Sequence, residues 1–364
     1  MQVMNEKFQE IFAEWQRIEP ARMQLKERIK QKFMLDFNYN SNHIEGNTLT
    51  YGQTELLLLF GQVMGDAKMR DLEEMKAHAV ALKMIVDEAV AGEMPLTETF
   101  IRQVHKVLLR EDYEVHRQLP SGAGTTYTVH AGTYKTRPNS VITHTGERFE
   151  YASPEETLAL MTDLLAWYNA ENEAGRLNPV ELAALFHYRY IRIHPFEDGN
   201  GRIARLMMNF ILARHGYPMV VVPSKGKDAY LTALNKCDVA VGSLPADGAH
   251  AAIVQIQPFV QYIETLLVDE MQSDIVIAGG NQQTQWWYNG ELVTFKNQNA
   301  TNILTEIERN SKISVRSLSE VLGINKSAVQ RHLKTLQEKG YIVRVGSKTN
   351  GGEWHVAMTK LSGK

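Results

Sequence analysis

The chain has 364 residues, of which 44% are hydrophobic, and a formal net charge of −3 at pH 7. Such a chain is long enough to bury a substantial core and to form two or three domains. Its single cysteine, Cys237, excludes an intrachain disulfide, its charged N-terminus differs from a signal peptide, and no apolar run reaches the roughly 18 residues of a membrane helix, so we expect a cytoplasmic protein with no membrane partner.

The first segment of interest runs from Ser41 to Asn47 and has the sequence SNHIEGN. By itself it predicts a short helical segment that ends at Gly46, because glycine is common where a helix stops. Taken alone, the segment favours this structural interpretation over a functional one.

The helical texture is interrupted between Ala131 and Pro154, where β-branched residues, glycines and prolines accumulate. This composition predicts a two-stranded hairpin. Further along, residues 179–193 are apolar without an internal proline or glycine and predict a buried helix, and residues 203–215 predict a second one.

Between these two helices lies the run HPFEDGNGRIAR, from His194 to Arg205. It is a loop that leads into a helix N-terminus, where unpaired backbone N–H groups and the helix dipole favour an anion. Gly199 and Gly201 permit positive φ and a close approach of a ligand to the backbone. Arg202 and Arg205 lie three residues apart, so both guanidinium groups project from one side of the helix toward phosphate oxygens. The run therefore predicts a polyphosphate site.

Two further side chains of the run carry chemistry. The carboxylate of Asp198 is repelled by a polyphosphate unless a cation lies between them, and Mg²⁺ held by one carboxylate and substrate oxygens is the ordinary solution. His194 is the only group of the run that takes up a proton near neutral pH, which makes it the candidate general base.

The run resembles the complete signature of the Fic family, HPFx(D/E)GNGRxxR, and matches it at every defined position. Similarity in the flanking sequence extends over roughly residues 31–267. The resemblance implies a mostly helical enzyme that transfers a nucleotide monophosphate, most often AMP from ATP, to a protein hydroxyl. It assigns His194 to the deprotonation of a Ser, Thr or Tyr hydroxyl and Asp198 to Mg²⁺. The residues that it assigns to the phosphates are Gly199, Asn200, Gly201, Arg202 and Arg205.

In a chain that carries this signature, a functional interpretation of the segment that contains Ser41 and Glu45 is favoured. It resembles the (S/T)xxxE(G/N) inhibitory motif of Fic proteins that carry an autoinhibitory helix on the N-terminal side. There the glutamate pairs with the second arginine of the signature, which would place Glu45 against Arg205. An arginine engaged by a carboxylate is unavailable to the γ-phosphate, so ATP would bind with its α-phosphate misaligned.

The resemblance also assigns two segments around the loop. The predicted hairpin, at about Arg137 to Gly146, occupies the position of the flap that covers the Fic active site and aligns the target by strand addition. The segment Lys227 to Leu234 resembles the helix that closes the adenine pocket, with Tyr230 as a candidate to pack on the nucleotide. The alternative for Tyr230 is a core aromatic residue at helical spacing.

The C-terminal part differs in charge from the rest. Residues 301–364 carry 11 basic and 5 acidic side chains, a net charge of +6, whereas residues 1–300 carry 28 and 37, a net charge of −9. Apolar spacing predicts three helices, the third opened by Asn325, and then a hairpin, a pattern that resembles a winged helix-turn-helix. The third helix would offer DNA the side chains Lys326, Ser327, Gln330, Arg331 and Lys334, with Arg344 and Lys348 on or near the wing. A protein-contact or dimerisation role is the alternative.

These features predict a mainly α protein with a small β-hairpin flap in a Fic helical core and a C-terminal winged helix domain. We expect an N-terminal helical region at residues 1–95, the Fic domain at 96–267, a polar and aromatic connector at 268–298, and the winged helix-turn-helix at 299–364.

Two functions fit this organisation. The first is an autoinhibited protein adenylyltransferase that uses ATP with Mg²⁺ and modifies a target protein or itself. The second is a DNA-binding transcriptional regulator whose Fic domain binds a nucleotide with little or no turnover. The intact His194 and Asp198 favour the first. The sequence leaves open the target protein, the oligomeric state, including a homodimer, and the transferred group, which could be AMP, UMP or a phosphoryl group. It also leaves open whether the same site removes AMP, with Glu45 orienting a water molecule.

Overall fold

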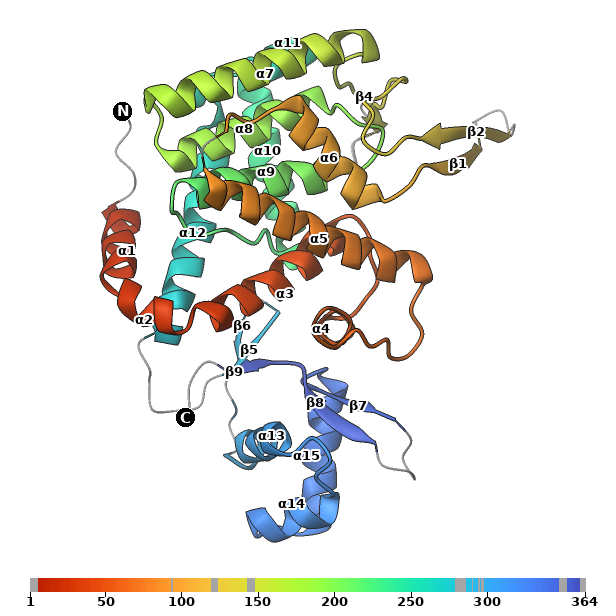
Figure 1. Cartoon of the computed structure of the whole chain (residues 1–364), viewed down its shortest axis with the longest axis vertical. Helices are drawn as coiled ribbons and strands as arrows, with labels where there is room; N and C mark the ends of the chain where they lie inside the picture. The colour runs from red at the N-terminus through yellow and green to blue at the C-terminus, as the bar shows by residue number, and fades with distance from the viewer. Residues whose placement is uncertain are drawn as a thin grey trace. The chain divides into compact units, whose positions relative to one another are not determined.

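The computed structural model of the chain is mostly helical, with short antiparallel strands (Figure 1). It describes residues 6–92, 94–118, 124–142, 148–278, 286–289, 291–293, 295, 298–346 and 352–360. The α-helices are α1 Glu6–Arg17, α2 Glu19–Gln24, α3 Lys26–Ile44, α4 Tyr51–Phe60, α5 Met69–Ala91, α6 Glu98–Leu109, α7 Pro154–Ala174, α8 Pro179–Ile193, α9 Asn200–Arg214, α10 Lys227–Val241, α11 Pro245–Ala249, α12 Gln257–Ala278, α13 Gln298–Arg309, α14 Val315–Leu322 and α15 Lys326–Glu338. The strands are β1 Tyr113–Gln118, β2 Gly124–Val129, β3 Val141–Ile142, β4 Arg148–Phe149, β5 Trp286–Tyr288, β6 Glu291–Val293, β7 Ile342–Val345, β8 Glu353–Val356 and β9 Thr359–Lys360. None of the described helices has both the length and the apolar character needed to cross a lipid bilayer.

The chain divides into two compact units, which are described separately. Unit 1 holds the residues up to Ala13, Asn40–Asn47 and Glu73–Met271, and unit 2 holds Glu14–Tyr39, Thr48–Leu72 and the residues from Gln272 onward. The domain boundaries expected from the sequence remain predictions.

The centre of unit 1 is the pair of helices α8 and α9, which pack against each other (Figure 1). Helix α8 has the predicted bounds. It begins at the capping box of Asn178 and Glu181 and ends at His194. Helix α9 begins at Asn200, three residues before the predicted start, because Gly199 adopts a φ of 79° and acts as its N-cap. Asn200 and Arg202 therefore lie in the first helical turn rather than in the loop.

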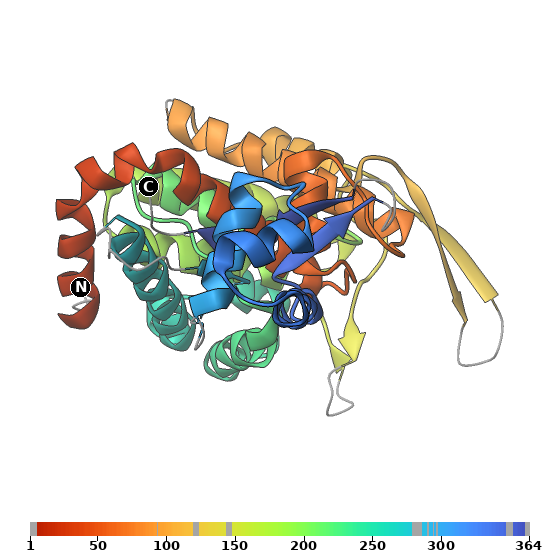
Figure 2. The same ribbon diagram turned by 90° about the horizontal axis from the view of Figure 1, so that it is seen from below.

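Unit 1 also carries two antiparallel hairpins. The pairing of β3 with β4 confirms the hairpin predicted between Ala131 and Pro154, although residues 143–146 of the expected flap lie outside the described part. The sequence analysis missed the longer hairpin β1–β2, in which Tyr113 pairs with Val129. Figures 1 and 2 both show β1–β2 extending away from the helices of this unit.

In unit 2, the three helices α13, α14 and α15 and the hairpin β7–β8 confirm the predicted winged helix-turn-helix. Asn325 caps α15 as expected, since its side chain accepts a hydrogen bond from the backbone N–H of Ala328. Part of the segment expected to be a connector instead forms the strands β5 and β6, and β5 pairs with both β6 and β9. The reason is apolar burial, because Trp286 is fully buried in the hydrophobic cluster of the winged helix.

Candidate active site

The loop begins at His194, which follows the last residue of α8 and adopts a φ of 52°. This left-handed conformation is uncommon for a residue other than glycine. The backbone N–H of His194 still donates to the carbonyl of Tyr190 at 2.9 Å. Pro195 explains why the helix ends here, because a proline disfavours the helical conformation of the residue before it.

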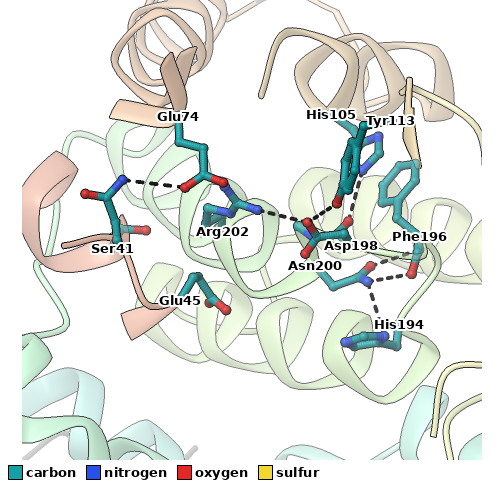
Figure 3. Close-up of polar contacts among 12 residues, drawn as sticks. Ser41, Glu45, Glu74, His105, Tyr113, His194, Phe196, Asp198, Asn200 and Arg202 are labelled. Atoms are coloured by element: carbon teal, nitrogen blue, oxygen red, sulfur yellow. Dashed lines mark hydrogen bonds and ion pairs between the residues drawn. The ribbon is translucent and has the colours of Figure 1, made fainter. Parts of the chain in front are cut away.

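The side chain of Asn200 holds the loop in shape. Its Oδ1 accepts a hydrogen bond from the backbone N–H of Phe196 at 2.9 Å, and its Nδ2 donates to the carbonyl of Phe196 at 2.7 Å (Figure 3). Asn200 is 2% exposed, so these two bonds satisfy the backbone N–H and carbonyl groups of Phe196 in a buried part of the loop. The family resemblance assigns Asn200 to the phosphates, whereas its contacts here are to the loop itself.

The imidazole of His194 is held by three side chains. Its ring stacks on Tyr151 with the centroids 3.9 Å apart. Its Nδ1 lies 2.7 Å from Nδ2 of Asn139 and 3.2 Å from Nδ2 of Asn200. Both carboxamides present their NH₂ groups here, because each of the two also donates to the carbonyl of Phe196. Nδ1 is therefore an acceptor, and the neutral ring carries its proton on Nε2.

The pKa of His194 is lowered to about 3, mainly by burial and also by the positive charge of Lys135, while the carboxylate of Asp198 acts in the opposite direction. The imidazole is thus neutral at pH 7. A neutral imidazole is the state that a general base requires.

Lys135 and Asn139 were not identified from the sequence. The Nζ of Lys135 donates to Oδ1 of Asn139 at 2.9 Å and to the carbonyl of Ile193 at 3.0 Å, and its backbone N–H donates to the carbonyl of Pro195 at 2.8 Å. Burial lowers the pKa of Lys135 to about 7. A lysine and an asparagine within a predicted hairpin are ordinary surface residues by pattern, so no sequence signal marked them.

Asp198 projects from the loop beside the start of α9. Its Oδ1 accepts from the backbone N–H of Gly199 at 2.6 Å and its Oδ2 accepts from the hydroxyl of Tyr113 at 2.5 Å (Figure 3). Nη2 of the charged Arg202 lies 3.5 Å from Oδ2. The backbone carbonyl of Asp198 is held in turn by Nε2 of His105, at 3.0 Å.

The carboxylate of Asp198 fits a magnesium ion of the substrate-bridging kind. It is 38% exposed, so water and phosphate oxygens can share the ion with it. Within the described ranges no group of three or more His, Cys, Asp or Glu side chains offers a metal site made of protein alone. A single carboxylate together with phosphate oxygens is the coordination that Mg²⁺ commonly accepts.

Arg202 retains binding capacity toward an anion. The residue is 4% exposed, and its Nε is buried without a hydrogen-bond partner among the described residues. An unpaired buried donor is costly. A phosphate oxygen is a partner that would satisfy it.

Arg205 is engaged by the segment that the sequence analysis singled out. Its Nη2 lies 2.7 Å from Oε1 of Glu45 and 2.9 Å from the carbonyl of Ser41, and its Nε donates to Oγ of Ser41 at 3.0 Å. The guanidinium is 1% exposed. Oγ of Ser41 also lies 3.0 Å from Nε2 of His78, whose pKa burial lowers well below its usual value.

Glu45 also covers the start of α9. A Cβ added at Gly201 would collide with Oε1 of Glu45, so the carboxylate lies against the first turn of the helix. That turn carries the unpaired N–H groups expected to bind phosphate. The carboxylate of Glu45 therefore lies beside the turn at which a phosphate is expected.

Two contacts hold the last turn of α3, which carries the start of this segment. The side chain of Asn40 accepts from the backbone N–H of Ser224 at 2.9 Å, and Nζ of Lys227 donates to the carbonyl of Ile44 at 2.8 Å. Since α3 ends at Ile44, Lys227 satisfies one of its unpaired carbonyls.

Tyr230 is buried on α10 at 3% exposure, and its hydroxyl lies 3.0 Å from Nε2 of His187. Its ring packs near Phe259 and Tyr262. Tyr230 also has a side-chain hydrogen bond with Arg205, so it connects the aromatic core to the phosphate site, and its contact with a nucleotide remains a prediction.

The predicted DNA-contacting residues share one exposed side of α15, opposite the buried Val329, Leu333 and Leu336. Arg344 lies on β7, where its guanidinium packs over the ring of Trp354 at 4.8 Å. Lys348 lies outside the described residues. The predicted contact residues Lys326, Ser327, Gln330, Arg331 and Lys334 are all exposed.

Comparison with known proteins gives two family matches. Residues 95–212 match the model of the Fic/DOC family, and residues 296–343 match a winged helix-turn-helix DNA-binding model. Among solved structures, a Fic domain containing signaling protein from Bacteroides thetaiotaomicron is 52% identical, with a TM-score of 0.70, and the match covers 75% of this chain and 97% of that one. A Fic family protein from Desulfovibrio desulfuricans, 20% identical over 97% of each chain with a TM-score of 0.54, shares the fold.

Named relatives include protein adenylyltransferase fic-1 of Caenorhabditis elegans, 29% identical over 239 residues, and protein adenylyltransferase Fic of Drosophila virilis, 30% identical over 236 residues. These matches cover 66% and 65% of this chain. They cover 40% and 41% of the two relatives, so the chain spans about two fifths of their length.

Proposed function

The chain belongs to the Fic family, and from that premise we propose that unit 1 is an autoinhibited adenylyltransferase, which transfers AMP from ATP to a Ser, Thr or Tyr hydroxyl of a target protein or of itself. The observation that carries the proposal is the ion pair of Glu45 with Arg205 beside a complete Fic loop. The names of the relatives support AMP as the transferred group.

ATP would bind with its phosphates against the first turn of α9. The free Nε of Arg202 and the guanidinium of Arg205 both lie on this side of the helix, where they neutralise the charge that grows as pyrophosphate leaves. Mg²⁺ held by Asp198 would neutralise further charge on the phosphates. Positioning and charge stabilisation are what phosphoryl-type transfer mainly needs from a protein.

In the transfer itself, the target oxygen forms a bond to the α-phosphorus while the bond from that phosphorus to the bridging oxygen breaks and pyrophosphate departs. The hydroxyl proton passes to His194, the neutral base of the loop. With its proton on Nε2, the ring has its free lone pair at Nδ1, where Asn139 and Asn200 donate to it. Nε2 can accept the hydroxyl proton only in the other neutral tautomer, in which the ring proton is on Nδ1. That tautomer requires the hydrogen bonds from the two asparagines to Nδ1 to break, so the arrangement in this structure keeps His194 in the tautomer that cannot use Nε2 as the base.

Inhibition follows from charge and space. While Glu45 pairs with Arg205, the guanidinium cannot bind the γ-phosphate, and the carboxylate repels phosphate from the helix start. ATP then has no anchor for its terminal phosphate, and its α-phosphate is not aligned with the target hydroxyl.

The test is transfer of radioactive label to protein in the presence of Mg²⁺, from ATP labelled at the α- or at the γ-phosphate. Wild type, Glu45→Gly and Glu45→Gly/His194→Ala are compared, with self-modification and cell lysate as acceptors. Label from the α-position that rises in the single variant and vanishes in the double variant supports the proposal. Label from the γ-position alone would indicate phosphoryl transfer, and no label from either would contradict the assigned activity.

The second candidate is a nucleotide-sensing DNA-binding regulator. The match of residues 296–343 to a DNA-binding winged helix and the exposed basic side of α15 favour it. DNA affinity of the whole protein, measured with ATP and without it at two salt concentrations, tests this candidate. A double substitution of Arg331 and Lys334 by alanine is expected to weaken DNA binding, and a variant that binds equally well would exclude α15 as the reader.

A further inference from the structure

A pocket of about 400 Å³ lies entirely within unit 2 and contains none of the Fic loop residues. Its walls come from α3, α4, the end of α13, and the strands β8 and β9. A volume of this size is ordinary for a pocket that holds a small molecule. The lining residues that matter for its chemistry are Arg28, Glu55, Phe60, Glu308, Trp354 and His355.

Glu55 is the unusual member of this lining. The residue lies on α4 and is 7% exposed, and its carboxyl has no hydrogen bond or ion pair within the described ranges. Its neighbours on the helix, Leu56 and Leu57, are buried in the core. Burial raises the pKa of Glu55 to about 8. A buried carboxyl without a partner costs free energy that a hydrogen-bonding ligand would recover.

A second polar atom of the pocket is also unsatisfied. Nε2 of His355 is buried without a hydrogen-bond partner among the residues that the structure describes, and Oε2 of Glu353 lies 4.0 Å away. Aromatic rings stand beside these polar groups. Phe60 lies with its ring centroid 5.2 Å from that of His355, and Trp354 is 5% exposed.

The remaining charges of the pocket offset each other. Burial lowers the pKa of the Arg28 guanidinium, and the nearby carboxylate of Glu308 opposes part of this lowering because it attracts the positive charge. Glu55 has no such counterpart among the described residues. With its pKa raised to about 8 the carboxyl is largely protonated at pH 7, so a cationic ligand binds its ionised form with release of that proton.

We propose that this pocket binds a small planar organic cation, an amidine or guanidine attached to an apolar ring. The N–H groups of the cation donate to the carboxylate of Glu55, and the ring packs against Phe60 and Trp354. Paired N–H donors match the two oxygens of a carboxylate, and an aromatic wall favours a cationic ligand.

Benzamidine and its neutral analogue benzamide are a matched pair of probes for the full chain, titrated by calorimetry or by protein-detected NMR without nucleotide. Saturable benzamidine binding is expected, at least about tenfold tighter than benzamide. Glu55→Gln preserves shape and removes the charge, so it should weaken benzamidine about tenfold or more. The exposed Glu320→Gln on α14 is the matched control and should leave the affinity unchanged.

Phe60→Ala is a second variant, since Phe60 is 52% exposed and its loss does not open the core. It should weaken benzamidine severalfold through the lost ring contact. The proposal is overturned if wild type shows no saturable binding, if benzamide binds as well as benzamidine, or if the folded Glu55→Gln protein binds like wild type. No outcome depends on nucleotide transfer, so the test stands apart from the proposed function.

Discussion

Oε1 of Glu45 lies 2.7 Å from Nη2 of Arg205, although 160 residues separate the two in the chain. The guanidinium is buried and the carboxylate is 37% exposed, so the pair sits at the edge of the phosphate site rather than in the core. A pair at an edge can open without unfolding the protein, which suits a reversible inhibitory contact.

Replacing Glu45 with glycine is expected to raise AMP transfer about 10- to 100-fold, because a charged hydrogen bond is worth about 1.5–3 kcal/mol and Arg205 is released to the γ-phosphate. The initial rate of label transfer from α-labelled ATP measures the effect. Glu27→Gly, at an exposed position near the start of α3, the helix that ends just before Glu45, is the matched control and should keep the wild-type rate. A rate unchanged in Glu45→Gly would contradict inhibition through this pair.

Ser41→Ala is expected to raise the rate by a smaller factor, about 2- to 10-fold. It removes the hydroxyl that accepts from Nε of Arg205 and contacts His78, but leaves the backbone carbonyl and Glu45 in place. Ser327→Ala, on the exposed side of α15, serves as the control. If Ser41→Ala transferred AMP as fast as Glu45→Gly, the hydroxyl of Ser41 rather than the carboxylate of Glu45 would be the main inhibitory contact.

The imidazole of His194 should stay neutral from pH 8 to pH 5, because burial lowers its pKa to about 3 and the proton is bound only below that value. Nitrogen-15 NMR of histidine-labelled protein reads both the charge and the tautomer, and His194→Ala identifies the signal. A protonated Nε2 and an unprotonated Nδ1 are expected. Titration of this signal near pH 6.5 would refute the burial argument.

Asp198→Asn is expected to raise the Mg²⁺ concentration needed for half-maximal transfer by about tenfold or more in the Glu45→Gly background, since a neutral amide is a weaker ligand for a hard cation. The amide oxygen can still accept from the backbone N–H of Gly199, and the amide NH₂ group can donate to the hydroxyl oxygen of Tyr113, so the loop should keep its shape. Chelation of Mg²⁺ should stop transfer in both proteins. An unchanged Mg²⁺ requirement would remove Asp198 from metal binding.

The sequence alone was sufficient for the local parts of this molecule. Helix α8 has its predicted bounds because an Asn-Pro start with Glu181 and a His-Pro end are signals carried within a few residues. The winged helix followed in the same way from apolar spacing and the cap at Asn325. The Fic signature named the loop residues because their chemistry depends on one continuous run of chain.

Only the tertiary structure decided which distant side chains meet at the loop. Nothing in the pattern around Asn139, Tyr151 or Tyr113 marks them as partners of His194 and Asp198, because a hydrogen bond or ring contact between remote segments depends on how the segments pack. The same holds for the paired tryptophans, which composition placed in a connector and burial placed in strand β5.

The pairing of Glu45 with Arg205 was predicted in part from the sequence and depends in part on the tertiary structure. A short motif predicted the partners, but the contact needs a 19-residue helix, α3, in place of the short helical segment expected, and the anchors at Asn40 and Ile44. Local sequence specifies helix ends, caps and a phosphate-binding turn, because their hydrogen bonds close within a few residues. The burial of Arg205, the tautomer of His194 and the unpaired carboxyl of Glu55 arise from packing between remote segments, which no local pattern encodes.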